Sequence, residues 1–257
     1  MINILVSEIV DYFYAFLLPF VRISAFTLAA PIFSLNAFNV RFRIIVATAL
    51  TVLAVELVEF NSQSLSIDSL IMLVLVQAFL GLFSGFVLQI ISGAVTVGGQ
   101  AISNSMGLGM ANLIDPTLGN VPVISQFLVI LSTLIFIVAD GHLVLIQILM
   151  QSFTTFPVDR TFSLNIIYDL FIEWTPLLFV GGLVLALPVI ISVLLVNAGL
   201  GMITRSAPAL NIISVGFPAI MLAGVIIILI ALPGIVQRID SFWREGFNTL
   251  GNFFGGL

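Results

Sequence analysis

Long apolar runs with almost no charge dominate the chain. The charge-free tracts include Ser69 to Ile114, Trp174 to Thr204 and Ser206 to Gln237. A helix that crosses a bilayer needs about 20 mostly apolar residues, and each of these tracts is long enough. The pattern therefore predicts an all-α integral membrane protein with about six long hydrophobic helices, near residues 12–30, 44–60, 69–96, 123–152, 174–200 and 211–236.

A polar, glycine-rich stretch separates the third and fourth of these segments. It runs from Gly98 to Pro122 and is interrupted by Pro116. Glycine permits unusual backbone angles and proline ends helices. Irregular backbone survives at membrane depth only where protein or a water-filled cavity surrounds it. The stretch is therefore either an aqueous loop or a re-entrant element that lines a passage.

The tail from Arg238 to Leu257 is amphipathic if it is helical, because its large apolar residues then share one face. This pattern favours an interfacial helix. Its glycines weaken helix formation, so a disordered or partner-bound tail is the alternative. Small residues also recur at four-residue spacing, as at Gly81 and Gly85. Such stripes favour close helix packing, either within the chain or against partner subunits.

The composition narrows the class of protein. Of 257 residues, 61% are hydrophobic and 7% are charged, whereas about a quarter are charged in soluble domains. All seven cations are arginine and the net charge is -5. No basic cluster is available for nucleic acid or for polybasic attraction to lipid headgroups. No cysteine is present, which excludes disulfides and thiolate metal sites. No cation precedes Arg22, so we expect the first segment to be retained as a structural helix.

Ionisable residues inside apolar segments are costly and are candidates for function. Asp140 and His142 could form a proton-carrying pair, but the glycine between them, Gly141, suits a turn. The sequence shows no third partner for the pair. It also contains no GxSxG, HExxH or P-loop motif. We therefore predict a structural turn, no enzymatic activity, and no catalytic, cofactor or metal residue. Arg22 is a further structural candidate. The pair Arg205 and Pro208 indicates a polar turn between two helices, or an interface to another subunit.

Short motifs in a fixed order along nearly the whole chain carry a family resemblance. They include Ala30–Ser34 after Arg22, Gly98–Gln100, Met106–Leu108, Asp115–Pro116, Asp140–His142, Ser152–Phe153, Ala186–Pro188, Ala207–Pro208 and Gly216–Pro218. With these motifs the chain resembles the FliR family of flagellar export-gate proteins, which also includes injectisome relatives.

The resemblance implies a part in protein export. Members assemble with FliP and FliQ into a pore-forming core in the bacterial inner membrane, within the flagellar basal body. FlhB associates with this core, FlhA lies beneath it, and unfolded flagellar proteins pass through it. The helices would form bent hairpins, partly lifted toward the periplasm. Residues 1–170 would be a FliP-like part, and residues 171–257 a FliQ-like hairpin with the amphipathic tail.

The family also implies a pore-closing loop near residues 106–122. Apolar side chains would form a deformable seal, since methionine adapts to irregular gaps, and glycines would let the loop swing aside. The residues concerned are Met106, Gly107, Leu108, Gly109, Met110, Leu113, Asp115 and Pro116. An injectisome subunit, a small-solute secondary transporter with broken helices and an intramembrane enzyme are the alternatives. The transporter lacks a visible inverted repeat.

Overall fold

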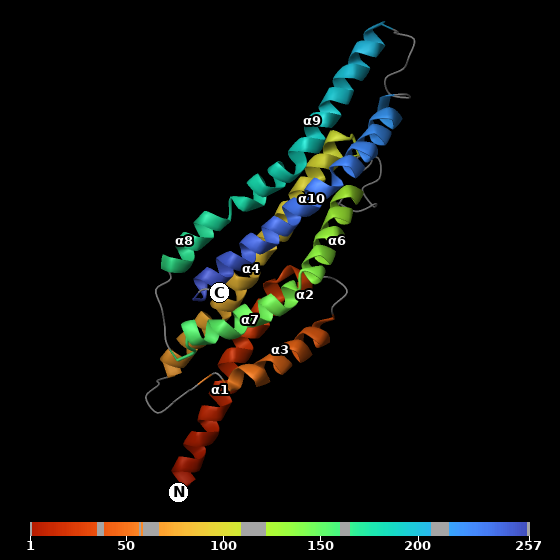
Figure 1. The fold of residues 1–257 in the computed structure, drawn as a ribbon. Coiled ribbons are helices and arrows are strands. Elements are labelled where there is room, and N and C mark those ends of the chain that lie inside the picture. The colour runs from red at the N-terminus through yellow and green to blue at the C-terminus, as the bar shows by residue number, and fades with distance from the viewer. Residues whose placement is uncertain are drawn as a thin grey trace. The chain divides into compact units, whose positions relative to one another are not determined.

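The described part of the chain is helical. The computed structural model describes residues 2–34, 39–56, 58, 67–108, 122–159, 165–206 and 216–255, and no strand occurs in these ranges. The helices follow one another along the chain as labelled in Figure 1. They are α1 (Ile2–Ala29), α2 (Pro31–Ser34), α3 (Val40–Val55), α4 (Ile67–Ser105), α6 (Val123–Val138), α7 (Gly141–Thr155), α8 (Asn165–Trp174), α9 (Leu177–Ser206) and α10 (Phe217–Phe253). The predicted all-α class is confirmed.

The chain divides into two compact units, and each draws on separate stretches of sequence. The first unit comprises Met1–Gln89, Asp140–Thr175 and Arg244–Leu257. The second comprises Ile90–Ala139 and Pro176–Trp243. Both α4 and α10 therefore contribute residues to each unit. Each unit also combines residues from the two parts of the chain, 1–170 and 171–257, that the sequence analysis distinguished.

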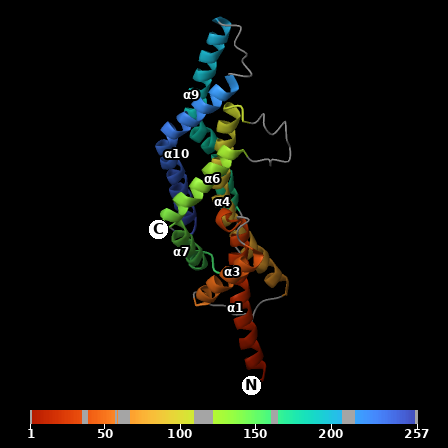
Figure 2. The ribbon, with the colours of Figure 1, turned by 90° about the vertical axis from the view of Figure 1, so that its right-hand side faces the viewer.

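The first unit is built on close contact between α1 and α4. A side chain added at Gly81 would overlap the backbone of Arg22, and one added at Gly85 would lie 2.5 Å from the Cβ of Ala29. In the same unit α3 lies against α1, as both ribbon views show (Figures 1 and 2). The spacing of Gly81 and Gly85 thus serves packing inside the chain.

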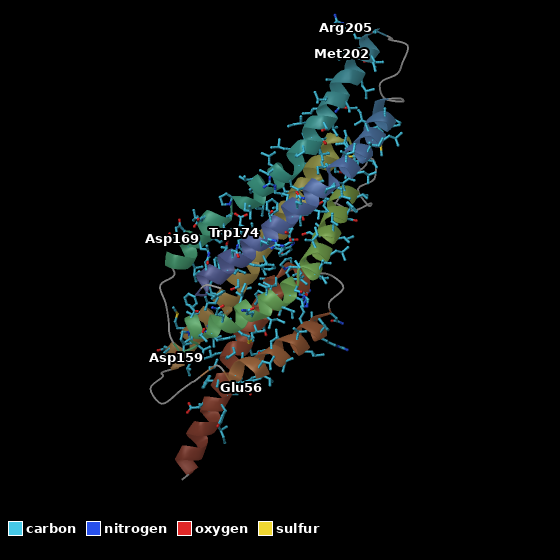
Figure 3. The ribbon with its side chains drawn as sticks, in the orientation of Figure 1. Glu56, Asp159, Asp169, Trp174, Met202 and Arg205 are labelled. Atoms are coloured by element: carbon cyan, nitrogen blue, oxygen red, sulfur yellow. The ribbon has the colours of Figure 1, made fainter. Side chains whose placement is uncertain are left out.

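The short helix α8 is attached to α4 within the first unit by two aromatic residues. The indole nitrogen of Trp174, which Figure 3 labels at the end of α8, donates a hydrogen bond of 2.9 Å to the carbonyl oxygen of Val87. The rings of Phe86 and Phe171 stack with centroids 5.2 Å apart. Such a pair adds about 0.5–1.5 kcal/mol beyond its buried area.

The second unit uses glycine in the same way. A Cβ at Gly98 would lie 2.9 Å from the carbonyl oxygen of Gly182, and a Cβ at Gly182 would lie 2.9 Å from that of Ala94. The backbones of α4 and α9 therefore approach closely. On α10, the ring of Trp243 lies 4.8 Å from that of Phe136 in a tilted arrangement, and its indole nitrogen donates a hydrogen bond of 3.0 Å to the hydroxyl of Ser132.

Within the described residues, four helical stretches are long and apolar enough to cross a membrane. They contain Ile9–Ala29, Asp68–Ser105, Ile167–Ser206 and Phe217–Phe253, and the bent pair α6 and α7 makes a fifth if it is counted as one span. The segment predicted near 44–60 corresponds to α3, whose 16 residues fall short of the roughly 20 that a crossing needs. The described ranges thus yield four or five candidate spans, where the sequence predicted about six segments.

The tail after Arg238 is helical but is not a separate element. It continues α10 without a break as far as Phe253. Its apolar face turns inward, because Trp243, Phe247, Leu250 and Phe254 are all less than one-tenth exposed. In the first unit Phe253 stacks on Phe156 at 5.2 Å. Packing within the protein, in place of the predicted membrane surface, buries this face.

Candidate functional site: the base of the loop between α4 and α6

Helix α4 ends in a Schellman motif at the start of the predicted pore loop. The amide of Leu108 donates to the carbonyl of Ser103 at 3.1 Å, and the amide of Gly107 donates to that of Asn104 at 3.0 Å. This six-to-one and five-to-two pattern defines the motif, which requires a left-handed residue just after the helix. Gly107 supplies it with φ of +78°, a conformation that costs other residues about 1–2 kcal/mol.

Met106 anchors this turn to α10 within the second unit. Its side chain is 1% exposed. A Cβ placed on Gly224 would lie 2.5 Å from the Met106 Cε and 2.9 Å from its sulfur, so the absence of a side chain at Gly224 creates the space that Met106 occupies. The ring of Phe217 lies beside Gly107. Met106 is therefore a buried anchor at the edge of the loop.

The other end of the loop returns to α4 in the same unit. Helix α6 follows Pro122, and the hydroxyl of Ser125 donates a hydrogen bond of 3.0 Å to the carbonyl of Thr96. Ser125 packs so closely that a Cβ on Gly99 would lie 2.5 Å from its Cα. Gly99 and Ser105 are about 9 Å apart along α4 at 1.5 Å per residue. The chain therefore leaves the second unit and rejoins it at nearby points along α4.

The predicted pore-closing residues divide between this base and the loop itself. Met106, Gly107 and Leu108 belong to the base. Gly109, Met110, Leu113, Asp115 and Pro116 lie outside the described residues. The structure thus describes how the loop is held at both ends, and the seal that the other residues would form stays a prediction.

Arg22 is the most deeply buried charged residue in the described part of the chain. It is 1% exposed on α1. Its Nε donates to Gln77 Oε1 at 2.6 Å, and its terminal nitrogens donate to Ser152 O at 2.8 Å, Ser152 Oγ at 3.0 Å and Phe156 O at 2.6 Å. The guanidinium also lies 4.4 Å from the centroid of the Phe153 ring. These contacts join α1, α4 and the end of α7 inside the first unit.

Among the described residues, the acceptors around Arg22 are all uncharged: an amide, a hydroxyl and two backbone carbonyls. The carbonyls of Ser152 and Phe156 lie at the C-terminus of α7, where the helix dipole carries partial negative charge and favours a cation. Arg22 therefore acts as a long-range cap of α7. Sequence reasoning selected Arg22 but missed Gln77, although Gln77 is a polar residue within a long apolar tract, and that was the available signal.

The remaining candidates are exposed. Asp140 and His142 both lie at the break between α6 and α7. Asp140 has φ of 53° and its side chain makes no capping hydrogen bond, while its carbonyl accepts the amides of Leu143 and Val144. Arg205 lies in the last turn of α9, as Figure 3 shows. Pro208 lies outside the described residues. The turn at Asp140 is thus a backbone feature.

Comparison with known proteins identifies the family. The family model for bacterial export proteins, family 1, matches residues 13–246. The flagellar biosynthetic protein FliR of Pectobacterium carotovorum subsp. carotovorum is 33% identical over 97% of this chain and 96% of its own. FliR of Escherichia coli K12 is 31% identical over 93% of this chain and 92% of its own length. FliR of Bacillus subtilis 168 is 30% identical over 96% of this chain and 96% of its own length. The chain therefore belongs to bacterial export proteins, family 1, and is a relative of the FliR proteins of the flagellum.

Proposed function

We propose that this chain is a subunit of the flagellar type III export gate that forms, with FliP and FliQ, the pore through which unfolded flagellar proteins cross the inner membrane. The observation that carries the proposal is the near full-length match to FliR proteins. The flagellar names of these relatives favour a flagellar assembly over an injectisome. FlhB and FlhA are the further partners that we expect.

Exposed apolar surface supports an assembled state. In the second unit, large apolar side chains of α10 such as Leu222, Leu229 and Ile230 are 63–76% exposed. Such a surface needs lipid or protein to cover it. We expect the chain expressed alone to aggregate in mild detergent, and co-expression with FliP and FliQ to yield a stable complex. A stable, monodisperse monomer with no affinity for either would instead favour the solute transporter.

The loop between α4 and α6 is the proposed closure of the pore. An open passage for an unfolded chain would dissipate ion gradients, so a seal is needed when no substrate is present. The base described above holds both ends of the loop on one unit through Met106 and Ser125. We propose that the intervening residues move aside during export while the base remains in place.

Deleting Gly109–Asn112 tests the seal, because it shortens the loop and leaves the Schellman motif and Ser125 intact. We expect an assembled complex that leaks ions and small solutes, measured as conductance or solute uptake in cells with complex levels determined in parallel. Deleting Asn61–Ser64, in the connection between α3 and α4, is the length-matched control and should leave the gate closed. A Gly109–Asn112 deletion that assembles and stays as tight as the parent would place the seal on another subunit.

A further inference from the structure

A groove with an apolar part and a polar part lies between α9 and α10 within the second unit. Its volume is about 530 Å³. Val184 and Pro188 of α9 and Ile230 of α10 line its apolar part. Gln237 and Arg238, farther along α10, line its polar part. The groove therefore changes from apolar to cationic along the axis of α10.

The protein's own side chains leave this groove open. Gly234 lies on its α10 wall, and a Cβ built there would meet no atom within 4 Å. Ile230 is 76% exposed. A molecule from the surrounding medium can therefore reach the apolar part of the groove.

Arg238 is positioned at the depth of lipid headgroups when α10 spans a bilayer. The stretch from Phe217 to Gln237 contains no charged residue. At 1.5 Å per residue it measures about 31 Å, close to the roughly 30 Å of a hydrocarbon core. Arg238 follows directly and is exposed. Within the described ranges its side chain makes no hydrogen bond or ion pair, so its charge is available to a ligand.

We propose that the groove binds one anionic glycerophospholipid, with an acyl chain along Val184, Pro188 and Ile230 and the headgroup phosphate on Arg238. Arginine forms charge-assisted hydrogen bonds with phosphate oxygens, and the amide of Gln237 can donate another. A headgroup with net negative charge complements an arginine that has no carboxylate partner. The chain has no polybasic segment, so recognition depends on this one cation next to an acyl-sized space.

Lipid retention by the purified complex tests the site. The complex isolated through this chain is exposed to phosphatidylglycerol or phosphatidylcholine with matched acyl chains, and bound lipid is counted by native mass spectrometry. Arg238→Gln should lower phosphatidylglycerol retention about tenfold, the effect of losing one charge-assisted contact, with little change for phosphatidylcholine. Gly234→Leu, which fills the groove, should lower retention of both lipids.

Two substitutions serve as matched controls. Arg205→Gln removes an exposed arginine from the end of α9, and Gly201→Leu adds the same side chain to α9 at a glycine that also has open space around it. Both should retain lipid like the parent. Equal retention by Arg238→Gln and its control, or displacement of the lipid by inorganic phosphate alone, would overturn the proposal.

Photolabelling of the unaltered chain gives an independent result that does not depend on how variants fold. Phosphatidylglycerol with a diazirine in its acyl chain is incorporated into membranes that contain the complex and is then activated. Cross-links should map to the Val184–Pro188 and Ile230–Ile235 peptides. Labelling spread evenly over the exposed apolar residues of α9 and α10 would show bulk solvation by lipid and refute a defined site.

Discussion

Replacing Gln77 by leucine should loosen the first unit, because it removes the only side-chain amide that accepts from Arg22 in the described chain. Gln77 is fully buried, accepts from Arg22 Nε at 2.6 Å and donates to the carbonyl of Val158 at 3.4 Å. The substitution leaves a buried charged donor unpaired and removes a weaker second bond. We expect a loss of about 2–3 kcal/mol, which corresponds to a melting temperature lower by about 4–12 °C.

The assay is the melting temperature of the purified complex, followed as loss of the monodisperse species on heating. Gln89→Leu is the matched control, because it makes the same change on the same helix at an exposed position. The double variant Arg22→Met, Gln77→Leu should lose less stability than the sum of the two single losses, since contacting residues are not additive. The reasoning would be wrong if Gln77→Leu had the same melting temperature as Gln89→Leu. It would also be wrong if the stability losses of Arg22→Met and Gln77→Leu simply added in the double variant, because the hydrogen bond between the two side chains would then contribute nothing.

Substitutions at three further positions test the base of the loop and the turn before α7. Gly107→Ala should destabilise the second unit by about 1–2 kcal/mol, because alanine is strained at positive φ; unchanged hydrogen exchange at the amides of Gly107 and Leu108 would contradict the Schellman motif. Met106→Ala should cost about 2–5 kcal/mol through the cavity left beside Gly224, and a melting temperature equal to that of the parent would argue against this anchor. Asp140→Asn should melt and export like the parent, since asparagine tolerates the left-handed region, whereas Asp140→Val should be less stable by about 1–2 kcal/mol. Loss of export in a fully assembled Asp140→Asn variant would instead point to a proton relay.

The apolar pattern predicted where most of the helices lie, but it predicted the residues at which they end less accurately. Helix α4 was expected to end near residue 96, yet it continues to Ser105. Glycine has low intrinsic helix propensity, so the pair Gly98 and Gly99 suggested a break. Tertiary contacts outweigh that preference, because Gly98 and Gly99 let α9 and Ser125 approach the helix. A single sequence contains no direct sign of such partners.

The same limit applied to the residues around Arg22. Its burial cost marked it as a candidate, but its partners lie 55 to 134 positions away in the chain. Two of its acceptors are backbone carbonyls, which no residue type reveals. Asp140 was easier to interpret, since an aspartate before glycine inside an apolar run indicates a turn, and the structure places the break there. Local chemistry was therefore predictable, whereas pairing across the fold was not.

The uncharged acceptors that the described residues provide for Arg22 have a consequence for the pH dependence of the first unit. A carboxylate partner would have tied the strength of this cluster to the acidity on one side of the membrane. Amide, hydroxyl and carbonyl groups neither gain nor lose protons at the pH values that cells maintain. The hydrogen bonds that hold α1 on the end of α7 therefore do not weaken through a change in the protonation of their acceptors. A shift in pH on either side of the membrane leaves the acceptor side of this joint unchanged.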